Sequence, residues 1–318
     1  MSSSGATAAE RIRQAGVLAL GCWAFGGTGW GRQSDDDSRA AMAAAWDAGV
    51  RHWDTALAYG GGHSESLCAA FLKGKRDEAY VATKGVPGSH PDSILESLET
   101  SLRNLETDYV DLYYLHWPRR GVDLRPSMER LESARARGLI RAIGVSNFAP
   151  AEMDQVREVG TIDAHQLCYN LLWRRAERDV IPYCARRGIA MVSYSSLAQG
   201  ILAGRFARDA VFEPGDSRST TVFFDPDAWP FVYDATEDLA RLASSVGRPL
   251  HYLAVQWILE QRCMTAVVVG ARNGHQAKDT VAALDGRLTQ DVVKQMTEIS
   301  DRVQARLPNE ENIFRYYP

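Results

Sequence analysis

The chain has 318 residues, of which 45% are hydrophobic and 24% are charged, a composition typical of a folded globular protein and not of a disordered one. Its net charge of −4 provides no basic surface for nucleic acid or for an anionic membrane, so we expect neither as a partner. The five cysteines form no CxxC pair or ligand-spaced cluster, which argues against a metal site or a disulfide framework and fits a reducing compartment.

Eight short apolar runs alternate with longer amphipathic runs along the chain. The apolar runs resemble strands buried on both faces, and they cover 17–21, 52–56, 79–84, 110–116, 142–147, 165–170, 190–195 and 266–270. This alternation predicts an α/β fold with a parallel sheet, and eight strands suggest a closed (β/α)8 TIM barrel. The count alone does not exclude an open doubly wound sheet, but no G-x-G-x-x-G fingerprint opens the first βα turn.

The amphipathic runs carry recognisable helix signals. Residues 35–48 begin with three aspartates, which suit the positive end of a helix dipole, and residues 91–105 place leucine and isoleucine at i, i+3 and i+4 spacing. Three further runs each end in a glycine of the kind that stops a helix, and these are 127–138, 150–160 and 177–188. We therefore predict helices in these crossovers.

We expect a single domain over residues 1–318, because no linker divides the chain. Within it we expect a poorly ordered N-terminus over 1–16, a long loop over 201–233, and a C-terminal helix and tail over 286–318. The N-terminus has no apolar signal region, and no apolar run approaches the roughly 20 residues of a membrane span. These observations predict a cytoplasmic protein without a membrane partner.

Four polar residues fall at or just after the ends of consecutive predicted strands, where TIM barrels carry their catalytic groups. They are Asp54, Tyr59, Lys84 and His116. A tyrosine hydroxyl is a weak acid at neutral pH, but a nearby ammonium lowers its pKa, and a buried lysine stays charged beside a carboxylate. The set therefore suits delivery of a proton to the alkoxide that forms when a carbonyl accepts a hydride. Tyr59 would be the acid, Lys84 and Asp54 would adjust its pKa, and His116 would orient the carbonyl.

Several sequence strings place these residues in a family pattern. In their order and spacing they resemble the aldo-keto reductase superfamily over about residues 18–285, and they are WDTALAYGGGHSE (53–65), ATKG (82–85), LYYLHWP (112–118), GVSNF (144–148) and SYSSLAQGILAGRF (193–206). The resemblance implies a TIM barrel and an NADP-dependent enzyme that interconverts carbonyls and alcohols. The family's Asp, Tyr, Lys and His tetrad falls on the four residues named above.

The resemblance also implies a site for NADPH or NADP+. It assigns the nicotinamide carboxamide to Ser146, Asn147 and Gln166, ring stacking to Tyr194, and the pyrophosphate to Ser195, Leu197, Gln199 and Gly200. The stretch with Gly270, Arg272 and Gln276 matches the part of the family that binds the adenosine 2′-phosphate. A guanidinium binds phosphate bidentately, so Arg272 would favour NADPH over NADH.

The substrate is less well defined by the sequence. We expect Trp23, Trp117 and Phe148 to line the pocket together with the 201–233 loop, and such aromatic walls suit a sugar ring or an apolar aldehyde equally well. Arginines near the rim either favour an acidic or polyhydroxylated substrate or serve only solubility, and these are Arg32, Arg119 and Arg120. The tail at 309–318 either closes over the pocket or packs outside it, where it could serve a homo-oligomer.

Two other functions share the same residue set. Cofactor-binding regulatory subunits of the potassium-channel beta-subunit kind resemble this family and keep its tetrad, although no separate docking segment is evident here. A sugar epimerase or dehydratase could use the same cofactor, because the tetrad supports proton and hydride movement in either direction.

The chain departs from the family pattern at two positions that frequently hold proline. Ser196 follows the Tyr-Ser pair after the seventh strand, and we expect a looser pyrophosphate loop there. Gly274 stands where proline starts the last barrel helix, and we expect a frayed helix start.

Overall fold

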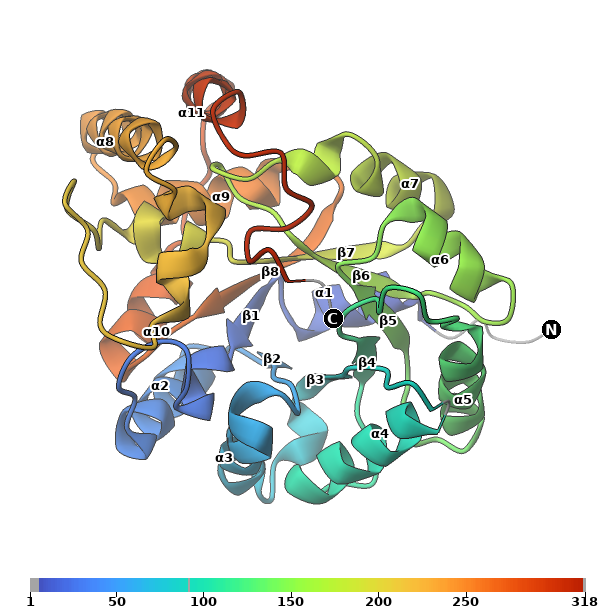
Figure 1. Ribbon diagram of the computed structural model, residues 1–318. Helices are drawn as coiled ribbons and strands as arrows, with labels where there is room; N and C mark the ends of the chain where they lie inside the picture. The colour runs from blue at the N-terminus through green and yellow to red at the C-terminus, as the bar shows by residue number, and fades with distance from the viewer. Residues whose placement is uncertain (1–5, 91, 317–318) are drawn as a thin grey trace.

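The computed structural model describes residues 6–90 and 92–316. In these ranges eight parallel strands close into a barrel in the order β1-β2-β3-β4-β5-β6-β7-β8, with β8 paired to β1. Figure 1 shows the strands at the centre and the helices in a ring around them. The predicted TIM barrel is confirmed.

All eight predicted strands are present, and each bound lies within two residues of the expected one. They are β1 (Leu18–Gly21), β2 (His52–Asp54), β3 (Tyr80–Gly85), β4 (Leu112–Leu115), β5 (Ile143–Ser146), β6 (Ala164–Cys168), β7 (Ala190–Tyr194) and β8 (Met264–Gly270). Almost every strand residue is buried, as expected for a sheet covered on both faces.

The crossover helices are α2 (Asp35–Asp47), α3 (His63–Leu72), α4 (Ser93–Asn104), α5 (Arg125–Ala136), α6 (Pro150–Arg157), α7 (Val180–Arg187), α9 (Leu250–Glu260) and α10 (Gly274–Ala282). Three further helices are α1 (Ala8–Ala15), α8 (Trp229–Ser245) and α11 (Gln290–Gln304). The five predicted crossover helices are among them. Residues 1–5, Pro91 and residues 317–318, where three of the predicted segments begin or end, lie outside the described residues.

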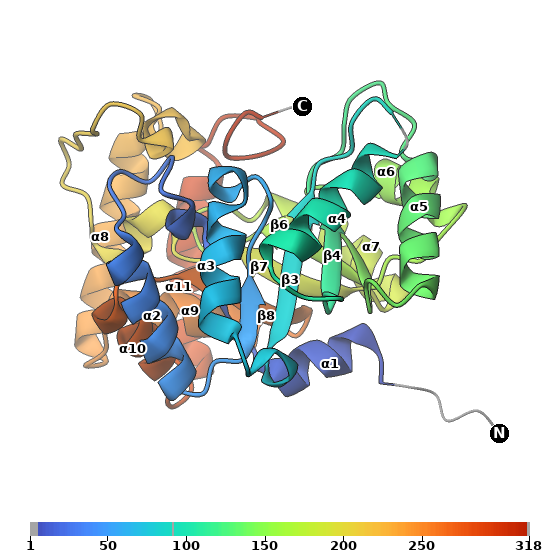
Figure 2. The same cartoon turned by 90° about the horizontal axis from the view of Figure 1, so that it is seen from below.

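Helix α1 corrects the expectation of a poorly ordered N-terminus for residues 8–15. The Thr7 hydroxyl accepts a hydrogen bond from the Glu10 N–H at 3.2 Å, and Glu10 Oε2 accepts one from the Thr7 N–H at 2.7 Å, which forms a capping box. Ala8 and Ile12 are buried against side chains of the barrel interior. Figure 2 shows α1 at one end of the barrel and the C-terminal tail at the opposite end.

The segment over 201–233 has more structure than the predicted loop. It contains short 3₁₀ turns at Ser217–Thr220 and Val222–Phe224, and α8 already begins at Trp229. An aromatic cluster stabilises it: Phe224 lies 4.9 Å from Phe206 and 4.5 Å from Trp229, measured between ring centroids. Aromatic packing of this kind gives a long loop a core of its own.

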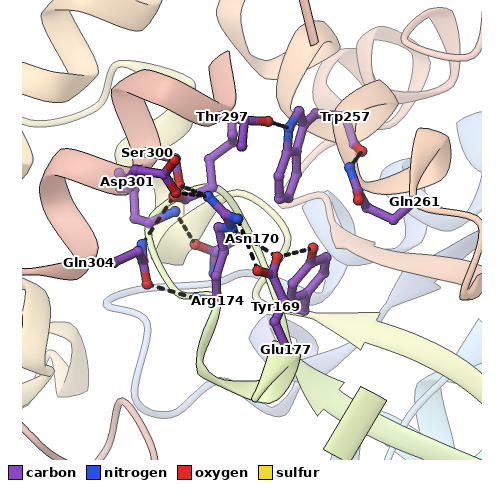
Figure 3. Close-up of polar contacts among 12 residues, drawn as sticks. Tyr169, Asn170, Arg174, Glu177, Trp257, Gln261, Thr297, Ser300, Asp301 and Gln304 are labelled. Atoms are coloured by element: carbon purple, nitrogen blue, oxygen red, sulfur yellow. Dashed lines mark hydrogen bonds and ion pairs between the residues drawn. The ribbon is translucent and has the colours of Figure 1, made fainter. Parts of the chain in front are cut away.

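Helix α11 (Gln290–Gln304) lies within the segment where we expected a C-terminal helix and tail. Figure 3 shows how Arg174, in the loop after β6, joins this helix to the barrel. Its Nη1 donates to Asp301 at 2.6 Å, while its Nε and Nη2 donate to the two oxygens of Glu177 at 2.8 and 2.9 Å. Arg174 thereby anchors α11 to the barrel, and the tail that follows α11 reaches the cavity at the C-terminal ends of the strands.

Candidate active site

The predicted catalytic residues meet at the C-terminal end of the barrel. The Lys84 ammonium donates to Asp54 Oδ1 at 2.7 Å and to the Thr55 carbonyl at 2.7 Å, and it lies 3.5 Å from the Tyr59 hydroxyl. An ammonium has three N–H donors, so these contacts use all of them. Lys84 is 0% exposed and Asp54 is 3% exposed, which makes this a buried ion pair.

Glycines let Tyr59 enter this arrangement. Residues 60–62 all have positive φ, and a Cβ on Gly60 would lie 2.2 Å from the Gly26 carbonyl oxygen. A Cβ on Gly26 would in turn lie 2.6 Å from the Gly60 nitrogen. The loops after β1 and β2 therefore touch through their backbones, at positions that only glycine satisfies.

Aromatic contacts fix the Tyr59 ring. The Trp23 ring lies stacked against it at a centroid distance of 5.9 Å, and the His116 ring meets it edge to face at 5.9 Å. His116 directly follows β4, and its backbone N–H donates to the Gly85 carbonyl at 2.9 Å. Tyr59 and His116 thus face the same space from neighbouring strand ends.

Burial and neighbouring charges shift the ionisation of this group. Burial raises the pKa of Tyr59 above its ordinary value near 10, and the Lys84 ammonium opposes that shift without cancelling it. Burial lowers the pKa of Lys84, but Asp54 and Tyr59 outweigh it, so that the pKa of Lys84 is raised. Burial and the Lys84 charge hold the pKa of His116 well below 6.5. The expected lowering by Lys84 is present, yet Tyr59 remains a protonated acid at neutral pH.

A cavity of about 620 Å³ opens beside these residues and extends to the ends of β7 and β8. Asp54, Tyr59 and His116 line it, whereas Lys84 lies beneath its surface. The predicted cofactor residues also line it, and these are Ser146, Asn147, Gln166, Tyr194, Ser195, Leu197, Gln199, Gly200, Gly270, Arg272 and Gln276. The structure therefore brings all of them to one cavity.

The residues predicted to bind the carboxamide are linked to the predicted catalytic residues. Gln166 Nε2 donates to Asp54 Oδ2 at 2.6 Å, which leaves the Gln166 carbonyl oxygen as an acceptor. Asn147, at φ 66°, donates to Ser146 Oγ at 3.0 Å and accepts from the Tyr194 hydroxyl at 2.6 Å. These side chains are held in place before any ligand binds.

The loop after β7 is ordered, contrary to the looseness expected from Ser196. The Ser196 hydroxyl donates to the Val268 carbonyl at 2.8 Å and lies 2.9 Å from the Ser193 hydroxyl. Asn170, labelled in Figure 3, donates to the Ser195 carbonyl at 2.9 Å. Ser196 thus holds the loop in place through hydrogen bonds to β7 and β8, where many relatives have the restricted backbone of a proline.

The start of α10 is likewise capped and not frayed. The Asn273 side chain accepts from the Gln276 N–H at 3.0 Å. Gly274 packs closely against α2, since a Cβ there would lie 3.1 Å from the Ala40 carbonyl oxygen. The Asn273 side chain therefore stabilises the start of α10 by capping a free backbone N–H, in the absence of a proline at position 274.

Three arginines gather at the end of the cavity near α10. Arg272 was predicted, whereas the sequence reasoning missed Arg205 and Arg218, which belong to the segment after β7. Arg218 is paired with Asp216, but no carboxylate of residues 6–90 or 92–316 lies within ion-pair distance of Arg205 or Arg272. Burial and repulsion from Arg218 and Arg205 lower the pKa of Arg272. A cation cluster with so few counter-ions is suited to bind an anion.

Aromatic side chains form the other end of the cavity, around Tyr59 and His116. Trp23 and Trp117 line it as predicted, and Trp30, Phe314 and Tyr316 join them. Phe314 meets Trp23 edge to face at 5.6 Å, so the tail closes over the pocket. Phe148 does not line the cavity: it is 1% exposed and packs in the hydrophobic core, because it points outward from the end of β5.

None of the three rim arginines lines the cavity, and Arg120 forms an ion pair with Glu311 at 3.0 Å. In the described part of the chain we find no group of three or more His, Cys, Asp or Glu side chains that could hold a metal ion. No helix within the described ranges is long and apolar enough to span a membrane.

Comparison with known proteins places this geometry in a family. The model of the Aldo/keto reductase family matches residues 17–301. The chain is 36% identical to the aldo-keto reductase YhdN of Bacillus subtilis over 275 residues, which is 83% of either chain. It is 30% identical to an NADH-specific methylglyoxal reductase of Escherichia coli over 313 residues, covering 90% of this chain and 95% of the relative.

Solved structures agree with these sequence matches. The glycerol dehydrogenase AKR11B4 from Gluconobacter oxydans superposes with a TM-score of 0.81 at 33% identity and covers 92% of each chain. An aldo/keto reductase from Klebsiella pneumoniae, solved with NADP and acetate, matches with a TM-score of 0.73 at 24% identity over 93% of this chain and 94% of that one, a likeness of fold.

Proposed function

The chain belongs to the aldo/keto reductase family, whose members are oxidoreductases that reduce carbonyls, and on this basis we propose that it is an NADPH-dependent carbonyl reductase with Tyr59 as its general acid. Its substrate would be an aldehyde, a ketone or a keto-sugar. The observation that carries the proposal is the Tyr59 hydroxyl, which faces the cavity 3.5 Å from a fully buried ammonium.

The residues along the cavity fit a reduced nicotinamide dinucleotide. The Gln166 carbonyl oxygen and the Ser146 and Asn147 side chains offer a set of polar groups for a carboxamide beside the Tyr194 ring. The arginine cluster at the far end suits phosphate. When bound, the cofactor supplies the hydride.

The chain's own residues would supply orientation and the proton. His116, kept neutral by its lowered pKa, can donate a hydrogen bond to the substrate carbonyl. The Tyr59 hydroxyl then delivers its proton to the developing alkoxide, and Lys84 stabilises the phenolate that remains. The aromatic rings around this point keep water away from the reacting atoms.

The test is a titration of the purified protein with NADPH and with NADH, followed by quenching of tryptophan fluorescence, and then a turnover screen of aldehydes, ketones and sugars. We expect tighter binding of NADPH than of NADH and NADPH-dependent reduction of at least one carbonyl class. Absence of binding by either cofactor would contradict the proposal. Because one relative is an NADH-specific enzyme by name, both cofactors are measured side by side.

Arg272→Ala is expected to raise the Kd for NADPH at least tenfold, with less than a twofold change for NADH. Charge-assisted hydrogen bonds are worth about 1.5–3 kcal/mol each, and only NADPH carries the phosphate that would receive them. The same fluorescence titration measures both constants. Equal weakening of the two cofactors would show that Arg272 does not contact the 2′-phosphate.

The rate of reduction is expected to be almost flat between pH 6 and 9. Tyr59 acts in its protonated form, so activity is present below its pKa and is lost as the pH rises through it, and the raised pKa of Tyr59 puts that loss above about pH 10. The lowered pKa of His116 keeps it neutral across the same window. Values of kcat/KM, obtained from initial rates in a series of buffers at constant ionic strength, would check this. An inflection near pH 6.5 would contradict the neutral state of His116.

A further inference from the structure

Gln33 is a residue for which the sequence suggested no role, and it contacts the predicted phosphate-binding arginine across 239 positions of the chain. Gln33 lies just before α2, and its Oε1 accepts from Arg272 Nε at 2.9 Å. Its Nε2 donates to the Arg272 carbonyl at 2.9 Å and to the buried hydroxyl of Ser38 at 3.1 Å. One side-chain amide is therefore hydrogen-bonded to both the side chain and the backbone of Arg272.

These contacts fix which way the Gln33 amide points. A guanidinium only donates and a carbonyl only accepts, so Oε1 must face the Arg272 side chain and Nε2 must face its backbone. The bond to Ser38, which is 0% exposed in α2, ties the amide to a packed helix. Gln33 is thus a rigid support and not a loose surface contact.

The support leaves one edge of the guanidinium for a ligand. The Nε–Nη2 edge of Arg272 is taken by Gln33 and by the Arg32 carbonyl. Within residues 6–90 and 92–316, no protein acceptor is bonded to Nη1, and the Arg32 carbonyl is the one acceptor bonded to Nη2. Nη1 and Nη2 together form the edge of a guanidinium that can bind a phosphate bidentately.

We propose that Gln33 is a specificity-determining positioning residue, which holds Arg272 with its Nη1–Nη2 edge available to the 2′-phosphate of NADPH. The proposal rests on the proposed function, and it adds that discrimination between NADPH and NADH depends on a residue that does not itself touch the phosphate. Without Gln33 the guanidinium would keep only its hydrogen bond to the Arg32 carbonyl, and its orientation would be less restricted. It would then have to be ordered by the ligand, at a cost in binding free energy.

Gln33→Glu and Gln33→Leu test this with matched controls. Glutamate keeps the acceptor for Arg272 Nε but adds a carboxylate that competes with the phosphate for the guanidinium. Leucine removes both hydrogen bonds to Arg272 and the one to Ser38. Gln290→Glu and Gln290→Leu make the same changes at an exposed position at the start of α11. Arg272→Ala serves as the reference for complete loss of the contact.

Dissociation constants would be measured by calorimetry for NADPH and NADH, and for the fragments adenosine 2′,5′-bisphosphate and 5′-AMP, which differ only in the 2′-phosphate. We expect both Gln33 variants to raise the constants for the two 2′-phosphorylated ligands at least fivefold, with glutamate at least as harmful as leucine. The constants for NADH and 5′-AMP should change less than twofold, and the Gln290 variants should match the parent.

A merely structural role would affect all four ligands equally, and Gln33→Glu would then be milder than Gln33→Leu because it keeps the hydrogen-bond acceptor. That result, or unchanged constants in both variants, would overturn the role of Gln33. If Arg272→Ala selectively weakens the 2′-phosphorylated ligands while the Gln33 variants do not, only this inference fails. If Arg272→Ala has no selective effect, the proposed NADPH preference fails and takes the inference with it.

Discussion

Tyr59→Phe is expected to lower kcat for carbonyl reduction by about 10²–10⁴, the range that a positioned general acid contributes. The substitution removes the hydroxyl 3.5 Å from Lys84 Nζ and leaves the ring. Phenylalanine can keep the stacked contact with Trp23 and the edge-to-face contact with His116, so the pocket should keep its shape. Stopped-flow or steady-state reduction rates, with the Kd for NADPH measured in parallel, would check it.

A second tyrosine provides the control. Tyr80 is 7% exposed in the barrel interior near α1, and its hydroxyl has no hydrogen-bond partner among the described residues. Tyr80→Phe removes the same atom at the N-terminal end of β3, at the opposite end of the barrel from Tyr59, and should leave kcat within about twofold, since losing an unpaired buried hydroxyl is nearly neutral. If Tyr59→Phe keeps more than a tenth of the parental kcat, Tyr59 is not the acid.

The strands, and the convergence of the four residues predicted to be catalytic, could be predicted because their signals are local. An apolar run of five or six residues marks a buried parallel strand, and catalytic positions at strand ends follow from the barrel itself. Asp54 illustrates this: it pairs with Ala82, which belongs to the buried cluster inside the barrel, so Asp54 also faces the interior, at the C-terminal end of β2. Once the strands were assigned, Asp54, Lys84 and His116 had to converge.

The missed features depend on contacts between distant segments, with one exception. Arg205, Arg218 and Gln33 approach Arg272 only because the loops after β1, β7 and β8 meet, and no local pattern specifies that meeting. Phe148 was misplaced because the inward and outward alternation of a strand says nothing reliable about the residue after its end. The exception is α1, whose Thr7-x-x-Glu10 capping box was readable in the sequence.

Lys84→Met is expected to reduce the free energy of unfolding by about 3–5 kcal/mol, the usual cost of removing one partner of a buried ion pair. Methionine fills much of the same volume, so a cavity is not the main cause. The Asp54 carboxylate would remain 3% exposed with Gln166 as its remaining hydrogen-bond donor from a side chain. Urea unfolding at pH 7 would measure the loss as a lower midpoint at an unchanged slope. The kcat for reduction should also fall by at least 10²-fold, because the variant lacks the ammonium that counteracts the burial-induced rise in the pKa of Tyr59.

The double variant Lys84→Met with Asp54→Asn separates the two effects. It removes both charges and keeps an oxygen that can accept from Gln166, so the uncompensated buried carboxylate disappears. We expect it to recover at least half of the stability that Lys84→Met loses, while its activity stays as low as that of the single variant. A double variant no more stable than the single one would mean that the loss comes from packing around Lys84 and not from the isolated charge. Recovery of activity together with stability would mean that the ammonium is needed only to hold Asp54, and Lys84 would then have no direct part in tuning Tyr59.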